Sequence, residues 1–410
     1  MIRLKGGLFK YQKLTDKEKK NLLFLDLIMQ KGPISRTDIS RETELNIVTV
    51  SNYINNFIEK GLVIEKGLDV SSGGRKPTLV ELDARCGYVI GIDIGPLNEL
   101  AIMTDLSTRI ITKDKRKRPQ GHMEEVIKVA TGLLSDIITN SNVPREKIMA
   151  VGFGISGVID EETGTIRDTD PKRGRTTGSL NAFRTSAEEK FQTPVFIGND
   201  ATCAAFGEKR LSLERGIEDM LYVYSDVGCG IIIKGDIYCG TGGSAGEIQL
   251  SLSPEDVTKA NISSEALTYL RPLGVDLGIV ARAKKAIEEG LGTKIVELIS
   301  GNLDGLTLEK VIEAAETGDK LAIELIETAG VNLGTRIAYL INLFNPEVVV
   351  IGGGVEKAGE LLLGPIRWAV RKFAFEEPAN KVRIIPSALG EDAVALGAAS
   401  LVLREIFTQI

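Results

Sequence analysis

Cysteine and histidine are scarce in this sequence of 410 residues. Its four cysteines lie far apart and form no Cys-x-x-Cys pair, which argues against a disulfide framework and against a zinc ribbon. We interpret all four as buried thiols; they are Cys86, Cys203, Cys229 and Cys239. The only histidine, His122, is followed by Met-Glu-Glu, which excludes the His-Glu-x-x-His pattern of zinc proteases. We therefore expect no metal site.

Long apolar runs are also missing. No stretch approaches the ~18 consecutive apolar residues that a membrane-spanning helix needs, and residues 1–5 do not resemble the start of a signal peptide. Hydrophobic residues make up 43% and charged residues 26% of the chain, which is ordinary for a globular protein. At ~150 residues per domain the length predicts two or three domains, and we expect no membrane contact and a cytoplasmic location.

Charge is distributed unevenly along the chain. Residues 1–84 contain 14 Lys and Arg against 11 Asp and Glu, whereas the remainder contains 36 against 45. A basic first module therefore precedes an acidic body. This asymmetry suggests that the first module meets a polyanion and that the body does not.

The first 84 residues predict a winged helix. Apolar periodicity predicts three helices, at 16–30, 35–43 and 47–60. Two strand-like runs follow, 62–65 and 78–82, joined by a glycine-rich tip that contains two cations. Helix, helix, turn, helix and hairpin is the order of a DNA-binding winged helix. The alternative is a small helical adaptor with an ordinary solvated face.

The third helix of this module presents short polar side chains. Val50, Ile54, Phe57 and Ile58 have core spacing, which leaves hydroxyls and amides outside. Asn can bond adenine through two hydrogen bonds, Ser and Thr can bond bases or phosphates, and a cation on the wing could enter the minor groove. The candidate DNA-binding residues are Arg36, Thr49, Ser51, Asn52, Asn55, Arg75 and Lys76.

Residues 85–410 predict a duplicated α/β body. A strand at 88–94 ends in Asp-Ile-Gly and leads into an alternating strand at 99–104 and another at 109–113. The same pattern of strand, glycine turn and strand returns 133 residues later. A third glycine cluster, 352–354, separates a strand from a helix expected at 356–362, and its amides could receive a polar ligand.

With these pieces in order, the chain resembles the ROK family (repressors, open reading frames and sugar kinases) over essentially its full length. The matching stretches are Ile92–Gly95, Gly152–Gly157, Gly198–Ala205, Gly242–Ile248, Ile351–Gly354 and Ser387–Ala393. The winged helix resembles the repressor branch, since the free-standing kinases of the family lack that module. The resemblance implies an actin-like, hexokinase-type duplicated α/β body with ribonuclease H-like halves, preceded by an all-α winged helix-turn-helix domain.

The resemblance also implies a division into domains. Residues 1–84 would bind DNA. Residues 85–205 would form the first lobe, completed by about 386–410, and residues 206–385 the second lobe, with effector and dimerisation surfaces.

Site residues follow from the same resemblance. Asp200 matches the family's general base in phosphoryl transfer to a sugar hydroxyl. The candidate effector-binding residues are Gly157, Asn199, Asp200, Glu247 and Glu265, and the candidate nucleotide-binding residues are Asp93, Gly95, Gly228, Gly230 and Gly353.

The sequence departs from the kinase pattern at several of these places. Leu250 replaces the family's zinc-binding histidine, and 251–264 contains no cysteine, so no zinc is expected. Pro96 removes a backbone N–H from the first phosphate turn, and Leu97 in that turn and Cys229 in the second stand where kinases have a hydroxyl. Each donor lost to a triphosphate should cost ~1.5 to 3 kcal/mol, so ATP binding is not expected.

The family's sugar loop is also missing. Pro171-Lys172-Arg173-Gly174-Arg175 stands in its place, and these cations could face an anionic effector such as a sugar phosphate or form a solvated loop.

We therefore expect a homodimeric or higher homo-oligomeric repressor of carbohydrate-related genes, with operator DNA and a small sugar-type effector as partners and no cofactor. Two alternatives stay open. One is an ATP-dependent sugar kinase with an accessory DNA-binding domain, and the other is a regulator that acts through protein partners.

Overall fold

The computed structural model describes residues 4–9, 14–68, 78–119, 123–160, 163–167, 177–214, 216–225, 228–248 and 274–410. Their contacts divide the chain into two compact units. Unit 1 comprises residues 1–203 and 394–410, and unit 2 comprises residues 204–393. The N-terminal module therefore groups with the first half of the α/β body.

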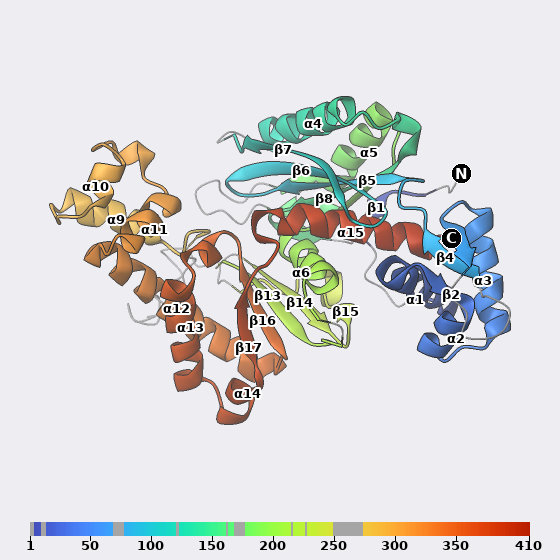
Figure 1. Ribbon diagram of the computed structural model, residues 1–410. Coiled ribbons are helices and arrows are strands. Elements are labelled where there is room, and N and C mark those ends of the chain that lie inside the picture. Colours follow the sequence, from blue (N-terminus) through green and yellow to red (C-terminus); the bar gives the residue numbers. More distant parts are fainter. Residues whose placement is uncertain are drawn as a thin grey trace. The chain divides into compact units, whose positions relative to one another are not determined.

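The N-terminal module is a winged helix, drawn in blue in Figure 1. Its helices and strands are α1 (Asp16–Lys31), β2 (Ile34–Ser35), α2 (Arg36–Thr43), α3 (Ile47–Glu59), β3 (Val63–Leu68) and β4 (Thr78–Leu82). The three strands form one sheet in the order β2-β4-β3. All three predicted helices and both predicted strands are present, and only the two-residue β2 was not predicted.

Local capping explains where the helices of the module begin. Thr15 and Glu18 form a capping box at the start of α1. Ser35 accepts a hydrogen bond from the amide of Asp38 at 3.1 Å, and Asn46 accepts one from the amide of Thr49 at 2.8 Å. Both caps satisfy amides that a helix start leaves without an intrahelical partner.

The rest of unit 1 is built on a six-stranded sheet in the order β1-β12-β8-β5-β6-β7. Its strands are β1 (Gly7–Leu8), β5 (Tyr88–Ile94), β6 (Asn98–Asp105), β7 (Ile110–Lys117), β8 (Ile148–Ile155) and β12 (Val195–Asn199). A smaller sheet contains β9 (Val158–Asp160), β10 (Thr165–Arg167) and β11 (Thr177–Ser179). The helices are α4 (Met123–Asn140), α5 (Leu180–Phe191) and α15 (Ala393–Thr408), with the short turn η1 (Arg145–Lys147).

The last helix of the chain, α15, completes this first lobe (Figure 1). It lies against the sheet at two glycines. A Cβ atom on Gly91 would lie 1.8 Å from the carbonyl oxygen of Ala395, and one on Gly152 would lie 2.8 Å from that of Ala398. Glycine is needed at both positions because any side chain would collide with the helix backbone.

Unit 2 repeats the plan with a five-stranded sheet in the order β15-β14-β13-β16-β17. Its strands are β13 (Met220–Tyr224), β14 (Gly228–Ile233), β15 (Asp236–Ile237), β16 (Val348–Gly352) and β17 (Arg383–Pro386). Its helices are α9 (Ile279–Glu288), α10 (Ile295–Leu298), α11 (Leu308–Glu316), α12 (Lys320–Phe344), α13 (Glu360–Phe373) and α14 (Glu376–Lys381). Short turns are η2 (Thr241–Gly243), η3 (Leu303–Gly305), η4 (Val355–Ala358) and η5 (Gly390–Asp392), and α6 (Asp200–Leu211) crosses from one unit to the other.

The two sheets confirm the predicted duplication. In each, an antiparallel meander (β5-β6-β7 or β13-β14-β15) continues into parallel strands on the side of its first strand. No helix within the described ranges combines the length and the apolarity that crossing a bilayer requires.

β6 is the alternating strand expected at 99–104, and the structure buries it on both faces from Glu99 to Asp105. Two expectations about local structure are wrong. The helix expected at 356–362 is instead the turn η4 followed by α13, because Gly359, with φ 57°, interrupts it. Cys86 and Cys239 are half-buried, whereas Cys203 and Cys229 are buried as expected.

Candidate DNA interface and effector site

The outer face of α3 is the candidate DNA interface. Val50, Ile54 and Phe57 are buried as expected whereas Ile58 is half-buried, and this side of the helix fixes α3 in the module. Asn52 and Asn55 are exposed on the opposite side, while Thr49 and Ser51 are half-buried at its flanks. The structure therefore brings together the four predicted residues of this helix as one surface, with the two asparagines at its centre.

Sequence reasoning missed an apolar residue on this surface. Val48 is 65% exposed and Ile47 is 45% exposed, both in the first turn of α3. Their spacing could have revealed them, since Val48 stands one turn before Asn52 and two turns before Asn55.

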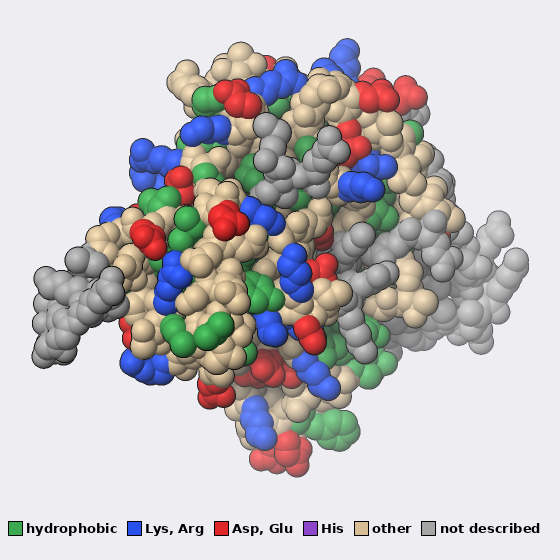
Figure 2. Space-filling model, turned by 90° about the vertical axis from the view of Figure 1, so that its right-hand side faces the viewer, with side chains coloured by type: hydrophobic (Ala, Val, Ile, Leu, Met, Phe, Trp, Pro, Cys, Tyr) green, Lys and Arg blue, Asp and Glu red, His purple; other side chains and the backbone are tan. Residues whose placement is uncertain are grey.

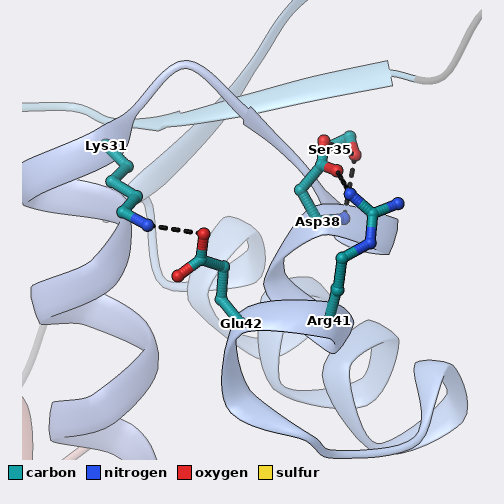
Figure 3. A network of polar contacts seen from close by, with 5 residues as sticks. All are labelled: Lys31, Ser35, Asp38, Arg41 and Glu42. Atoms are coloured by element: carbon teal, nitrogen blue, oxygen red, sulfur yellow. Dashed lines mark hydrogen bonds and ion pairs between the residues drawn. The ribbon is translucent and has the colours of Figure 1, made fainter.

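Ion pairs involve both ends of α2, the helix that precedes α3. Lys31 of α1 pairs with Glu42 at 2.5 Å, and Arg41 pairs with Asp38 at 3.0 Å (Figure 3). The same Asp38 carboxylate accepts from the Ser35 hydroxyl at 2.6 Å, so the cap and the ion pair share one residue. Such exposed pairs are worth little stability; the Lys31–Glu42 pair joins α1 to α2, whereas the Arg41–Asp38 pair lies within α2.

Of the three predicted DNA-binding cations, the structure describes only Arg36, and this residue forms an ion pair. Arg36 pairs with Glu65 of β3 at 3.3 Å, so it contacts a strand of the wing in the unbound module. Arg75 and Lys76 lie outside the described residues. Basic and acidic side chains are interspersed on the face shown in Figure 2.

The candidate effector site in unit 1 lies where β12 meets α6. The Asn199 side chain donates to the carbonyl of Gly157 at 3.2 Å and accepts from the amide of Thr202 at 3.0 Å. Asp200 accepts from the amide of Ala201 at 2.7 Å through Oδ1. Its Oδ2 is buried and has no hydrogen-bond partner among the residues described. Gly157, Asn199 and Asp200 are thus brought together, and one carboxylate oxygen is left to accept from a ligand hydroxyl.

Burial sets the proton affinity of this carboxylate. Burial raises the pKa of Asp200 to about 6, against the hydrogen bonds from Ala201 and Ser156, which lower it. A carboxyl group with such a pKa can accept a proton near neutral pH.

The first phosphate turn is closed by a buried arginine. Arg118 donates to the carbonyl of Gly95 at 2.9 Å through Nη1, and its own amide donates to the carbonyl of Leu97 at 3.0 Å. Asp93, at the end of β5, is buried beside this turn. Burial, Asp200 and Glu99 raise the pKa of Asp93 well above its usual range, while Arg118 and Lys115 oppose them.

Glu99 is a second residue that sequence reasoning missed. It is 0% exposed, and neither of its carboxylate oxygens has a hydrogen-bond partner in the described part of the chain. Burial raises the pKa of Glu99 to about 7, although Arg118 and Arg116 lower it. An acidic residue in an alternating strand normally indicates the solvated face, so the pattern concealed its burial.

The candidate nucleotide residues of unit 2 are tightly packed. Gly228 and Gly230 lie on β14, where the amide of Cys229 donates to the carbonyl of Gly246 at 2.8 Å. Burial raises the pKa of the Cys229 thiol to about 12, so it is a neutral packing group. Gly353 follows β16 and has a φ of 87°, a backbone conformation that only glycine adopts readily.

The remaining predicted residues are less informative. Glu247 is exposed, in the turn after η2. Glu265 lies outside the described residues, as do the Lys172–Arg175 loop and Leu250. The sequence at the family's zinc position supplies no histidine or cysteine, so its donor set does not fit zinc. Within the part of the chain that the structure covers, no three His, Cys, Asp or Glu side chains gather as a metal site would require.

A model of the ROK family matches residues 89–252 and 278–405, well over half of the sequence. The chain belongs to the ROK family. This membership confirms the resemblance drawn from the motifs, and the matched residues are those of the α/β body.

Relatives that match nearly the whole chain are named as repressors or as a transcriptional regulator. The chain is 28% identical to the xylose repressor of Caldicellulosiruptor bescii, covering 96% of this chain and 97% of the relative. It is 26% identical to the xylose repressor of Bacillus subtilis strain 168, with 95% and 96% covered. It is 27% identical to the DNA-binding transcriptional dual regulator NagC of Escherichia coli K12, with 94% and 92% covered.

Solved structures of the ROK family confirm the fold. A ROK family transcriptional regulator, described as a homolog of the E. coli MLC protein, matches with a TM-score of 0.74 at 21% identity, covering 96% of this chain and 97% of its own. A ROK family glucokinase from Streptomyces griseus, solved with glucose and AMPPNP, matches with a TM-score of 0.60 at 26% identity. It covers 77% of this chain and 99% of its own, so the kinase is similar to part of the chain and the regulator to nearly all of it.

Proposed function

We propose that this chain is a transcriptional repressor that binds operator DNA through its winged helix and senses a sugar or sugar derivative in its ROK body. The observation that carries the proposal is the surface of α3, where exposed Asn52 and Asn55 stand on a helix whose opposite side is buried. Amides so placed suit base edges in a major groove. Relatives named as repressors over nearly the whole chain support it, and such a regulator acts in the cytoplasm, where bacterial DNA lies.

The effector would bind at the Asn199–Asp200 end of the first lobe. The free Oδ2 of Asp200 and the carbonyl of Gly157 are acceptors, and the neutral hydroxyls of a sugar are donors. One relative is named as a xylose repressor and another, from Escherichia coli O6:H1, as an N-acetylglucosamine repressor, so these two sugars are the first candidates. A ligand changes DNA binding only if its affinity differs between the DNA-binding conformation and another.

Catalysis of phosphoryl transfer is not part of the proposal. At the first phosphate turn Pro96 has no amide proton to offer a phosphate and Leu97 has no hydroxyl. The retained Asp200, with its pKa near neutrality, favours the rival hypothesis of a sugar kinase. A coupled ADP-release assay with ATP and xylose, glucose or N-acetylglucosamine separates the two, since we expect no turnover above the background of an Asp200→Asn variant.

A homodimer is part of the proposal, because a two-fold pair of winged helices would match a pseudo-palindromic operator. Unit 2 exposes five large apolar side chains along the ends of α12 and α13 and the start of α14: Tyr339, Leu343, Trp368, Phe373 and Phe375. Cations at 371–372 and acidic residues at 376–377 adjoin them, so the patch is self-complementary in charge under a two-fold axis. Sedimentation velocity should show a dimer that Phe375→Glu dissociates; a monomeric wild type would contradict this part.

The experiment that tests the proposed function is selection of bound duplexes from a random library by the full-length protein. We expect a consensus with two-fold symmetry, and we expect xylose or N-acetylglucosamine to change the affinity for it. Enrichment of no sequence would overturn DNA recognition and would favour the alternative of a regulator that acts through protein partners. An enriched sequence whose binding ignores every sugar would overturn the sensing half alone.

A further inference from the structure

The first turn of α3 carries an exposed apolar side chain on the outer face of the helix. Val48 lies one helical turn before Asn52 and two turns before Asn55, so these three side chains share a side of the helix. At 65% exposed, Val48 is the most exposed of the large apolar side chains described in the winged helix. The carboxyl-terminal end of the same face carries exposed Glu59, which phosphates would repel.

The composition of this helix limits which base pairs it can read. None of the residues Ile47–Glu59 is lysine or arginine, which are the side chains that most often contact guanine. Asparagine pairs with adenine through two hydrogen bonds, and apolar side chains contact the 5-methyl group of thymine. The exposed side chains of α3 are therefore suited to recognise A·T base pairs.

The position of Val48 decides what it contacts. A single exposed valine is common on a protein surface and needs no explanation. The first residues of a recognition helix, however, are those that reach base edges in the major groove. Val48 stands in this first turn, directly after the Asn46 cap that fixes where the helix begins. Burying it there removes apolar surface of both valine and thymine from water.

We propose that Val48 contacts the 5-methyl group of a thymine while Asn52 pairs with an adenine nearby, so that A·T pairs occupy the centre of each half-site. This inference rests on the proposed function, since it needs the module to bind DNA. It assigns base recognition to a residue whose type alone gives no indication of it, and it gives α3 an apolar and a hydrogen-bonding contact spaced by one turn.

The test removes the two contacting groups separately. The probe is the duplex obtained by selection from the random library, with thymines replaced one at a time by deoxyuridine, which lacks only the 5-methyl group. At one position or two per half-site we expect the wild-type dissociation constant to rise about fourfold, the factor that ~0.8 kcal/mol for one buried carbon represents. Val48→Ala should bind the thymine and deoxyuridine duplexes equally.

Two control variants keep the test specific. Ile111→Ala, at a position 39% exposed on β7 of the α/β body, should retain the full difference between the two duplexes. Val48→Thr keeps the shape of the side chain but replaces one of its two γ-methyl groups by a hydroxyl, so it should retain part of the difference while the fold, followed by circular dichroism, is unchanged.

Three results would overturn the inference: equal wild-type binding of the thymine and deoxyuridine duplexes at every position, a difference that persists in Val48→Ala, or a selected half-site with a G·C centre. A library that yields no enriched duplex would instead overturn the proposed function, so the two failures are distinguishable.

Discussion

The guanidinium of Arg118 and the carbonyl of Gly95 are joined by a 2.9 Å hydrogen bond at the turn where the kinases of this family bind phosphate. The arginine is 6% exposed and is surrounded by carboxyl groups whose pKa values it lowers, namely those of Asp93, Asp200 and Glu99. One buried cation thus braces the turn and offsets part of the negative charge of the site.

Arg118→Met should therefore destabilise unit 1. Among the described residues Arg118 is the cation that lowers the pKa of all three carboxyl groups, so removing it leaves buried acids uncompensated. Breaking such an arrangement costs ~3 to 5 kcal/mol. Urea unfolding followed by circular dichroism measures the change. Arg116→Met is the matched control on β7, because Arg116 is 38% exposed and its surface pairs with Asp114 and Asp136 should contribute no more than about 1 kcal/mol. Equal effects of the two substitutions would contradict the bracing role.

Glu99 should make stability depend on pH near neutrality. Its pKa is about 7 in the folded protein and ~4.3 in an unfolded chain, so between these values the folded state binds more protons. The contribution of Glu99 to the free energy of unfolding is therefore expected to be highest below about pH 4.3 and to fall as the pH rises through 7. Glu99→Gln should flatten that slope and should exceed the wild type in stability at pH 8. Urea titrations at several pH values measure both slopes, and parallel curves would refute the assignment.

Close packing of α12 against α13 predicts a steric effect in unit 2. A Cβ atom on Gly334 would lie 2.7 Å from the carbonyl oxygen of Ile366 and 2.8 Å from the Cβ of Ala369. Gly334→Ala should thus force the helices apart and destabilise the protein by ~1 to 3 kcal/mol. Gly364→Ala in α13, where a Cβ would meet no atom within 4 Å, should instead stabilise by up to ~1 kcal/mol through helix propensity. Thermal unfolding of both variants distinguishes the effect of packing from that of helix propensity. A change of the unfolding temperature in the same direction for both variants would contradict the prediction.

The cap of the recognition helix predicts a coupled loss of stability and binding. Asn46→Ala removes the side-chain acceptor of the Thr49 amide and should lower the stability of the winged helix by ~1 kcal/mol. Binding to the selected duplex should weaken too, because the first turn of α3 carries Val48. Asn46→Ser restores an acceptor and should recover most of both properties. Fluorescence anisotropy with a labelled duplex gives the affinity; unaltered binding by Asn46→Ala would show that the first turn is not at the interface.

Much of the winged helix follows from local sequence. Ser35 and Asn46 are good caps, so the starts of α2 and α3 could be predicted within a residue. The two-residue strands β1 and β2 could not be, because they carry no periodicity and exist only through pairing with β12 and β4. Such strands depend on chain segments that lie far away in sequence, which a local pattern does not record.

The sequence predicts the positions of the glycine turns and of Asn199 and Asp200, but it does not predict the buried charged residues beside them. The glycine turns and the Asn199–Asp200 pair stand at strand ends, which their sequence context indicates. Glu99 and Arg118 have the residue types of a solvated surface, and only the covering of β6 on both faces buries Glu99. The burial of a charged residue depends on which elements cover it, and the positions of those elements are a property of the tertiary fold.

The measurement that tests the central claim most directly is the ratio of affinities for two duplexes, the selected one and a shuffled one of the same composition, at a single moderate salt concentration. A sequence-reading repressor should prefer the selected duplex by ~10³-fold or more. Asn52→Ala should reduce this ratio while leaving the affinity for the shuffled duplex unchanged, because the amide reads bases and does not hold phosphates. Equal affinities of the wild-type protein for both duplexes would contradict the account.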